Sequence, residues 1–505
     1  MKTAVYLIGA GPGDPELITL KGRRCLEVAN CVIYDHLVNR ELLSYAPPEA
    51  ERVYVGKQGG RDNIPQTEIN SLILTRAAQG KTVARLKGGD PFIFGRGGEE
   101  AEVLARAGIS FEVVPGVSAG SAAPAYAGIP LTHRDYGPTV AFVAAQQDPT
   151  REDPLLDWGK ISSAANTLVF FMGARSLRQV VEQLIHHGRS PSTPVALIRW
   201  GTYPSQEVVT GTLGCILDRS GNMPPPTIIV VGEVVRLRKQ VQWFDNRPLF
   251  GKRILITRPQ QQARDFRRAL ELLGATVITF PTLEVREPDS WTSLDQALDT
   301  IDQYDWLIFT SINGVKFFFK RYFRRHPDIR QLKDIRIAAI GPATRRAVLD
   351  FNLTVDILPN DYQAEGLVES LRGKVVKGMR VLLPRARVAR EVLPQQLQNQ
   401  GARVHVVEAY QTTLPVNADS RWNQILDDTP PHMVVFTSSS TVTNLANLPG
   451  PRPLAENLEG IAVACIGPIT ANTARKLGLH VNIVPEKYTT ASLIESIETY
   501  FSGSD

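Results

Sequence analysis

Residues 85–100 read Arg85-Leu86-Lys87-Gly88-Gly89-Asp90-Pro91-Phe92-Ile93-Phe94-Gly95-Arg96-Gly97-Gly98-Glu99-Glu100, and in them a strand-like segment meets a helix-like one. Ligands of α/β proteins bind at such junctions, beyond the carboxyl ends of the strands. The glycines let main chain approach a bound molecule closely, and the two glutamates suit the first turn of the following helix. The stretch therefore predicts an α/β protein with a ligand site at this turn.

Strand-to-turn units of the same kind mark the whole first half of the chain, at residues 4–10, 83–87, 111–114 and 140–144. Glycine or proline directly follows the first three, and a helical pattern follows most of them. After the first unit, Asp14 suits a helix N-cap and Pro15 the first helical position. The small-residue-rich segment 115–123 predicts a crossover between two subdomains, with a cleft beside it.

Length and composition set the outer bounds. The 505 residues exceed what one hydrophobic core usually supports, and 43% hydrophobic with 21% charged residues is ordinary for a globular protein. No run approaches the roughly 18 apolar residues of a membrane helix, and the N-terminus has no signal-peptide cleavage pattern, so we expect a cytosolic protein without membrane contact. The four cysteines lack CxxC spacing, and His186-His187 lacks a third ligand at metal-binding spacing, so we expect no metal.

The net charge of +5 is mild and is not gathered into one long basic tract. This favours a small polyanionic substrate over nucleic acid. The best nucleic-acid candidate is segment 316–326, which interleaves aromatic and basic residues, but an amphipathic helix with snorkelling arginines explains it better.

The α/β pattern breaks at residues 242–251 and resumes at 253, which places a module boundary near 245–251. The second module contains an internal repeat. Ile254 returns as Val381, Gly274 as Gly401 and Phe309 as Phe436, each at an offset of 127 (381 − 254, 401 − 274, 436 − 309). Ile340-Gly341-Pro342 returns as Ile466-Gly467-Pro468 at an offset of 126 (466 − 340). Two similar α/β lobes around a cleft are predicted.

The loops after corresponding strands of the repeat carry hydroxyl groups, at residues 310–314 and 437–441. Hydroxyls and free backbone N–H groups at helix N-termini bind carboxylates or phosphates without a metal. Serine and threonine are also common helix caps, so a duplicated scaffold remains the alternative. Two such loops at equivalent positions favour anion binding.

Several motifs of the first module occur together in a fixed order, and as a set they resemble uroporphyrinogen-III C-methyltransferase. They are Gly9-Ala10-Gly11-Pro12-Gly13-Asp14-Pro15, Tyr34-Asp35-His36, Val55-Gly56-Lys57, Gly88-Gly89-Asp90-Pro91, Val114-Pro115-Gly116-Val117-Ser118-Ala119 and Gly128-Ile129-Pro130-Leu131-Thr132-His133-Arg134. A dinucleotide-binding reading of the first motif is weak, because Asp14 stands where GxGxxG needs Gly or Ala.

The resemblance implies S-adenosylmethionine bound between two subdomains, with contacts from Pro12, Gly88, Gly89, Asp90, Ile93, Ser118, Ala119, Met172 and Gly201. It also implies Asp35 as proton acceptor and Lys57 as proton donor. Arg134 is a candidate for binding substrate carboxylates, with a solvated loop as the equal alternative. One departure is that Ala144-Ala145-Gln146-Gln147 stands where this family typically carries Thr-Gly-His after the strand.

The second module resembles uroporphyrinogen-III synthase, through the repeat, residues 309–315, Tyr410-Gln411-Thr412 and Ile466-Gly467-Pro468-Ile469-Thr470. The resemblance implies that Tyr410, at the end of a strand over 404–409, protonates the leaving hydroxyl of hydroxymethylbilane. A buried structural tyrosine is the alternative. Carboxylate anchors are then expected at Thr310, Ser311, Thr344, Thr437, Ser438 and Thr470.

The chain is thus expected to be a bifunctional α/β enzyme that makes uroporphyrinogen III and methylates it to precorrin-2, toward sirohaem or cobalamin. A two-subdomain tetrapyrrole methyltransferase fold is expected over 1–245 (subdomains about 1–114 and 117–245), then a linker at 246–251. A two-lobed synthase is expected over 252–505, with one lobe at 252–283 plus 411–505 and the other at 284–410. We also expect a homodimer through the methyltransferase module. The alternative is an active methyltransferase with a non-catalytic, tetrapyrrole-binding regulatory module.

Overall fold

The computed structural model describes residues 4–56, 64–145, 156–221, 223–258, 260–375, 377–387, 389, 391–415, 417–448 and 452–503. The chain divides into two compact units between Arg253 and Ile254, and segment Arg268–Val277 with the end of the last helix counts with the first unit. No helix within the described ranges is both long and apolar enough to span a bilayer.

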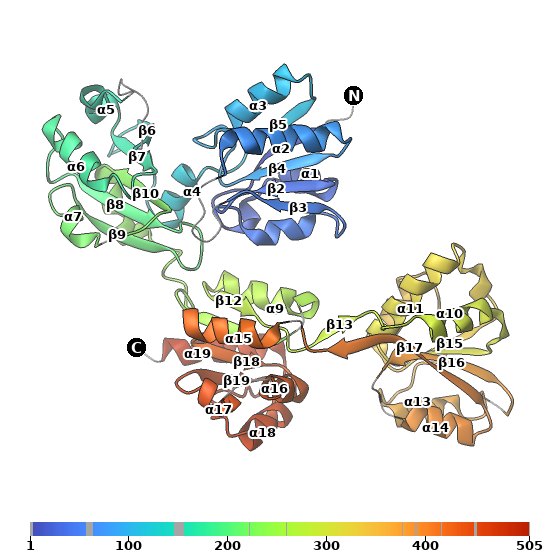
Figure 1. Ribbon diagram of the computed structural model, residues 1–505. Coiled ribbons are helices and arrows are strands. Elements are labelled where there is room, and N and C mark those ends of the chain that lie inside the picture. Colours follow the sequence, from blue (N-terminus) through green and yellow to red (C-terminus); the bar gives the residue numbers. More distant parts are fainter. Residues whose placement is uncertain are drawn as a thin grey trace. The chain divides into compact units, whose positions relative to one another are not determined.

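The first sheet is parallel, in the order β3-β2-β4-β1-β5 (Figure 1). Its strands are β1 (Val5–Gly9), β2 (Cys31–Tyr34), β3 (Glu51–Tyr54), β4 (Val83–Lys87) and β5 (Phe111–Val114). Its helices are α1 (Leu20–Glu27), α2 (Gln66–Ala78) and α3 (Gly97–Arg106). All five strands end at one edge, as the predicted alternation of strands and helices requires.

The second sheet, in the order β6-β7-β10-β8-β9, is mixed: β6 and β7 are parallel, and the other pairs are antiparallel. Its strands are β6 (Val140–Ala144), β7 (Thr167–Phe171), β8 (Pro194–Arg199), β9 (Glu207–Thr212) and β10 (Thr227–Val231). Its helices are α4 (Ala119–Tyr126), α5 (Trp158–Ala164), α6 (Leu177–His186) and α7 (Ile216–Arg219), and α8 (Arg238–Val241) follows the sheet.

Two more sheets follow, in the orders β12-β11-β18-β19 and β13-β17-β16-β14-β15. The third sheet has β11 (Arg253–Ile256), β12 (Thr276–Thr279), β18 (Met433–Phe436) and β19 (Ala462–Cys465), with helices α9 (Gln260–Leu272), α15 (Ala418–Asp428), α16 (Ser439–Ala446), α17 (Leu454–Asn457), α18 (Pro468–Lys476) and α19 (Thr490–Ser502). The fourth sheet has β13 (Glu284–Arg286), β14 (Trp306–Phe309), β15 (Arg336–Ala339), β16 (Arg380–Ala386) and β17 (Arg403–Thr413), with α10 (Thr292–Asp299), α11 (Ile312–Arg325), α12 (Pro342–Leu349), α13 (Ala364–Leu371) and α14 (Val392–Asn399).

The internal repeat is visible in the hydrogen bonds of these two sheets. Ile340 N–H donates to Phe309 O, and Ile466 N–H donates to Phe436 O, both at 3.0 Å. The bridges Ala338↔Ile357 and Ala464↔Ile483 are likewise related by 126 residues (464 − 338, 483 − 357). The repeat predicted from the sequence is therefore also a repeat of the structure.

Helix α11 is the aromatic and basic segment that raised the question of nucleic acid. Phe318, Phe319 and Tyr322 are fully buried in the core of the fourth sheet. Arg321 and Arg325 pair with Asp295 of α10. The expected amphipathic helix is confirmed, because these aromatic side chains pack in the core and these arginines form ion pairs with a neighbouring helix.

Candidate functional site

Three glycines bring the ends of β1, β4 and β5 together at the edge of the first sheet. A Cβ on Gly116 would lie 2.3 Å from Gly89 O and 2.6 Å from Gly9 Cα. Gly89, at φ +69°, exchanges two backbone hydrogen bonds with Gly11, of 2.7 and 3.2 Å. Any side chain at Gly9 or Gly116 would have to displace main chain, so the three loops form one close-packed surface.

Asp90 ties two of these loops. Its side chain is buried, and its two carboxylate oxygens accept hydrogen bonds from Phe92 N–H (2.8 Å) and Gly116 N–H (2.9 Å). In this structure the aspartate of the glycine-rich stretch therefore shapes the loops after β4 and β5.

The loop after β1 is fastened to the second subdomain. Asp14 caps the short 3₁₀ helix Pro15–Leu17, and its second oxygen accepts a hydrogen bond from the Tyr126 hydroxyl at 2.7 Å. The backbone N–H of Asp14 donates to Thr202 Oγ1 at 3.0 Å. Asp14 thus acts as a cap and a tie between subdomains, which explains why the sixth position of the glycine motif is not Gly or Ala.

Strained backbone gathers at the same ends of the strands. In the described part of the first unit, the non-glycine residues with positive φ all follow β4, β7 or β8: Phe94 (52°), Arg96 (57°), Met172 (55°), Trp200 (46°) and Thr202 (75°). Such conformations cost about 1–3 kcal/mol each and cluster at ligand sites. Elsewhere the described residues of this class are Asn352 and Asn417, a residue type that tolerates positive φ.

Large apolar side chains are exposed around this edge: Leu37 after β2, then Phe92, Ile93, Phe94, and Met172 after β7. The rings of Phe94 and Phe171 lie 4.8 Å apart, which joins the loop after β4 to the end of β7. Exposed apolar groups beside glycine-rich main chain suit a ligand that is partly apolar and partly held by backbone groups.

The cofactor contacts expected from sequence lie at these strand ends. Pro12 follows β1; Gly88, Gly89, Asp90 and Ile93 follow β4; Ser118 and Ala119 begin α4; Met172 follows β7; Gly201 follows β8. Ser118 is the N-cap of α4, and its Oγ accepts from Gly120 N–H. A Cβ on Gly201 would lie 2.3 Å from Ala123 Cβ, so glycine lets this loop pack closely on α4.

Of the proposed proton-transfer pair, only Asp35 falls within the described residues; Lys57 lies outside them. Asp35 follows β2, and its carboxylate lies 3.5 Å from the guanidinium of Arg85. Arg134 is exposed in the turn closed by reciprocal backbone hydrogen bonds between His133 and Gly137. At the departure from the usual Thr-Gly-His, Ala145 N–H donates to Phe171 O, and the two following glutamines are outside the described residues.

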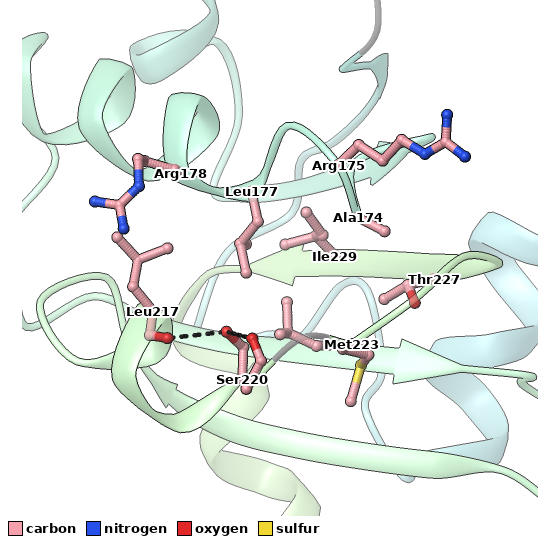
Figure 2. Close-up of a pocket in the computed structure, with 11 residues that line it drawn as sticks. Ala174, Arg175, Leu177, Arg178, Leu217, Ser220, Met223, Thr227 and Ile229 are labelled. Carbon is pink, nitrogen blue, oxygen red and sulfur yellow. Dashed lines mark hydrogen bonds between the residues drawn. The ribbon is translucent and has the colours of Figure 1, made fainter.

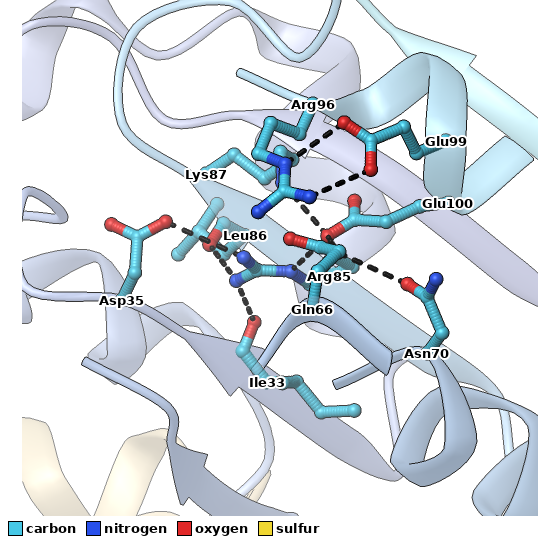
Figure 3. Close-up of polar contacts among 10 residues, drawn as sticks. All are labelled: Ile33, Asp35, Gln66, Asn70, Arg85, Leu86, Lys87, Arg96, Glu99 and Glu100. Carbon is cyan, nitrogen blue, oxygen red and sulfur yellow. Dashed lines mark hydrogen bonds and ion pairs between the residues drawn. The ribbon is translucent and has the colours of Figure 1, made fainter. Parts of the chain in front are cut away.

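A buried charged cluster behind Asp35 was missed by sequence reasoning. Arg85 and Lys87 of β4 both donate to one oxygen of Glu100, at 3.0 and 2.8 Å (Figure 3). The sequence placed Glu100 in the first helical turn, but it could not show that this glutamate points inward while Glu99 stays exposed. The available signal was the spacing of Arg85 and Lys87, which puts two basic side chains on one face of a buried strand.

A separate cavity of about 260 Å³ lies in the second subdomain. Figure 2 shows Leu177, Met223 and Ile229 around it, with the guanidinium of Arg175 directed away. Ile229 belongs to the core under α6, whereas α4 packs on the opposite face, which carries Ile198 and Val230. This cavity is therefore distinct from the strand-end site.

In the synthase module, Tyr410 is buried and its hydroxyl lies 3.0 Å from Ser311 Oγ. Its ring stacks on Phe317, with centroids 5.9 Å apart. Ser311 also caps α11 by accepting from Gly314 N–H at 3.0 Å. Strand β17 continues to Thr413, so Tyr410 lies inside a longer strand than the expected 404–409 and pairs with Ala386 of β16.

The hydroxyl residues expected as anchors fall in two groups, each at the carboxyl edge of its own sheet. Thr310 and Ser311 follow β14, and Thr344 lies in the first turn of α12 after β15. Thr437 and Ser438 follow β18, and Thr470 lies in the first turn of α18 after β19. Ser438 caps α16 as Ser311 caps α11, but its hydroxyl lies 2.9 Å from Ser440 Oγ rather than from a tyrosine. The duplicated loops therefore share their backbone conformation, but the side chains that surround the capping serine differ.

Comparison with known proteins assigns both modules. Residues 4–216 match the family of tetrapyrrole (corrin/porphyrin) methylases, and residues 264–495 match uroporphyrinogen-III synthase HemD. The porphyrin biosynthesis protein HemD of Ruminiclostridium josui is 34% identical over 501 residues, covering 98% of this chain and 97% of that protein. The uroporphyrinogen-III C-methyltransferase of Priestia megaterium is 50% identical over 233 residues, 46% of this chain and 98% of that protein.

A solved structure of uroporphyrin-III C-methyltransferase from Thermus thermophilus, complexed with S-adenyl homocysteine, is also similar. It is 39% identical, with a TM-score of 0.40, and the match covers 46% of this chain and 93% of that one.

The fold and the two family matches define an α/β enzyme of tetrapyrrole synthesis, with a methylase module followed by a duplicated synthase module. The chain belongs to the family of the porphyrin biosynthesis protein HemD, as a fusion of uroporphyrinogen-III C-methyltransferase with uroporphyrinogen-III synthase. Both resemblances predicted from the motifs are thereby confirmed.

Proposed function

We propose that the synthase module converts hydroxymethylbilane to uroporphyrinogen III, and that the methyltransferase module methylates this product twice with S-adenosylmethionine to give precorrin-2. The observation that carries the methyltransferase part is the convergence of strained backbone, close-packed glycines and exposed apolar side chains where the strand ends of the first sheet, beside Asp35, meet the loops after β7 and β8 of the second sheet. Precorrin-2 would serve sirohaem or cobalamin synthesis.

The residues at this edge fit S-adenosylmethionine. Phe92, Ile93 and Met172 offer apolar surface to a nucleoside and a thioether chain, and glycine-rich turns after β4 leave main-chain groups accessible. When bound, the cofactor supplies an electrophilic methyl group on a sulfonium, which a carbon nucleophile attacks without help from a metal. The candidate contacts are the nine residues given above, from Pro12 to Gly201.

Asp35 is proposed to accept the proton that the tetrapyrrole loses as each new carbon–carbon bond forms. It follows the carboxyl end of β2, next to β4, and one of its carboxylate oxygens accepts a hydrogen bond from Leu37 N–H at 3.1 Å. Positioned bases of this kind contribute about 10²–10⁴-fold. Lys57 as proton donor and Arg134 as a carboxylate contact stay parts of the proposal on the strength of the family resemblance.

In the synthase, Tyr410 is proposed to donate its phenolic proton to the departing hydroxyl, so that the carbon–oxygen bond breaks and water leaves. The Ser311 hydroxyl lies 3.0 Å from the tyrosine oxygen and can donate to it, an arrangement that leaves the phenolic proton for the substrate. Thr310, Ser311, Thr344, Thr437, Ser438 and Thr470 would bind substrate carboxylates from two sheets, holding both ends of the linear tetrapyrrole for ring closure.

We further propose the module extents 1–245 and 252–505, with lobes divided near 283 and 410, and a homodimer through the methyltransferase module. Light scattering on the purified chain tests the dimer, with a monomer mass as the contradicting result.

Each activity can be tested separately. Uroporphyrinogen III supplied with methyl-labelled S-adenosylmethionine should gain two labelled methyl groups, and no incorporation would overturn the methyltransferase assignment. Hydroxymethylbilane supplied alone should give the type III isomer. If only the spontaneous type I isomer forms, the C-terminal module binds tetrapyrroles without catalysis.

A further inference from the structure

Glu100 is a buried carboxylate, with 1% of its surface exposed, in the first turns of α3. Three donors from two other elements converge on its Oε1: Arg85 Nε and Lys87 Nζ of β4, and Gln66 Nε2 of α2 at 3.1 Å. Its Oε2 is also buried and has no hydrogen-bond partner in the described structure. A buried carboxylate oxygen without a hydrogen-bond partner lowers the free energy of unfolding. The arrangement therefore calls for a reason other than stability.

Arg85 connects Glu100 to Asp35. Its guanidinium lies between the two carboxylates, 3.0 Å from Glu100 and 3.5 Å from Asp35 (Figure 3). Its Nη1 also donates to the carbonyl oxygens of Ile33 and Leu86, at 3.4 and 3.1 Å. The guanidinium is therefore held from several directions, and only the side toward Asp35 reaches a partly exposed group.

Among the residues that the structure describes, the charges of the cluster balance only when Asp35 is included. Arg85 and Lys87 carry +2, Glu100 carries −1, and Asp35 supplies the remaining −1. Burial, and after it the charge of Arg85, lowers the pKa of Lys87. Buried ion pairs contribute little net stability compared with apolar side chains of similar volume. Burying this cluster between β4, the central strand of the sheet, and α3 therefore costs free energy, and a role in the site would explain that cost.

We propose that Glu100 is a positioning residue for methyl transfer: it holds Arg85 in place, and Arg85 in turn fixes the direction of the Asp35 carboxylate at the edge of the sheet. The inference rests on the proposed role of Asp35 as proton acceptor. Glu100 itself touches neither substrate nor cofactor in this account, because it lies in the protein interior behind Arg85 and Lys87.

The test is a double-mutant cycle between Glu100 and Asp35, measured as the turnover of methyl transfer from labelled S-adenosylmethionine to uroporphyrinogen III. Glu100→Gln should lower kcat by about 10- to 100-fold, because a small misplacement of a catalytic group costs this much. KM and the affinity for S-adenosylmethionine should stay within about twofold. In an Asp35→Asn background, the same substitution should cause no further loss, and Glu100→Asp should restore part of the activity of Glu100→Gln.

Glu102→Gln is the matched control, since Glu102 lies on the same helix, is exposed and pairs with Arg106. It should leave kcat unchanged. If Glu100→Gln does not fold, Arg85→Lys takes its place in the cycle, because lysine keeps the charge but not the fork that reaches both carboxylates.

A loss of equal factor in both backgrounds would make the cluster merely structural and overturn the inference, as would full activity of Glu100→Gln. Full activity of Asp35→Asn is a different result, which would refute the proposed role of Asp35.

Discussion

Replacing Gly116 by alanine tests the close packing of the three strand ends. The added Cβ would lie 2.3 Å from Gly89 O, whereas real Cβ contacts do not fall below 3.0 Å, so main chain must move by at least 0.7 Å (3.0 − 2.3). The atoms in the way are backbone, and overpacking of this kind costs about 1–3 kcal/mol. If that cost falls on the geometry that binds S-adenosylmethionine, the Kd rises by about 5- to 150-fold.

Titration calorimetry with S-adenosylmethionine measures this effect, and differential scanning calorimetry reports whether the module still folds. Gly98→Ala is the control, because a Cβ at Gly98 of α3 meets no atom within 4 Å. Its Kd should equal that of the wild type, and its helix should gain stability. Equal Kd values for Gly116→Ala and wild type would refute the idea that these three loops form the cofactor site.

Three further substitutions probe the two proposed catalytic sites and the ion pairs of Glu51 on β3. Asp35→Ala should leave S-adenosylmethionine binding nearly intact while methyl transfer falls about 10²-fold or more; unchanged turnover would remove Asp35 from the mechanism. Tyr410→Phe should slow cyclisation of hydroxymethylbilane about 10²-fold, with methylation of supplied uroporphyrinogen III as the internal control; normal cyclisation would leave Tyr410 a structural residue. Hydrogen bonds from Arg76 and Lys81 lower the pKa of Glu51 from 4.5 to about 2. Their stabilisation is complete above pH 4.5 and lost as the pH falls toward 2, so the Tm difference between wild type and Glu51→Gln should shrink over that range; a constant difference would contradict the assignment.

Much of the fold was predictable because turn residues mark the ends of buried apolar runs. Strands β4 and β5 begin and end where the sequence predicts, since glycine or proline follows each directly. The duplication was predictable because its helix starts keep their serine and glycine-proline caps. The strand carrying Tyr410 was predicted too short, because Gln411 and Thr412 pair with β13, which lies more than a hundred residues earlier.

The site was less predictable than the fold. Glycine positions locate the strand ends. The strained conformations at Met172, Trp200 and Thr202 depend instead on how the loops after β7 and β8 pack against the loops of the first sheet. The inward turn of Glu100 depends on packing between α3, β4 and α2, and two adjacent glutamates look alike in sequence. Contacts between distant segments decide both features, so local pattern alone could not supply them.

The central claim is that one chain carries both activities. The measurement that tests it supplies the purified protein with freshly generated hydroxymethylbilane and methyl-labelled S-adenosylmethionine, and determines the mass and isomer type of the tetrapyrroles formed. The account predicts a type III product carrying two labelled methyl groups. Unlabelled uroporphyrinogen III, or type I products alone, would contradict it.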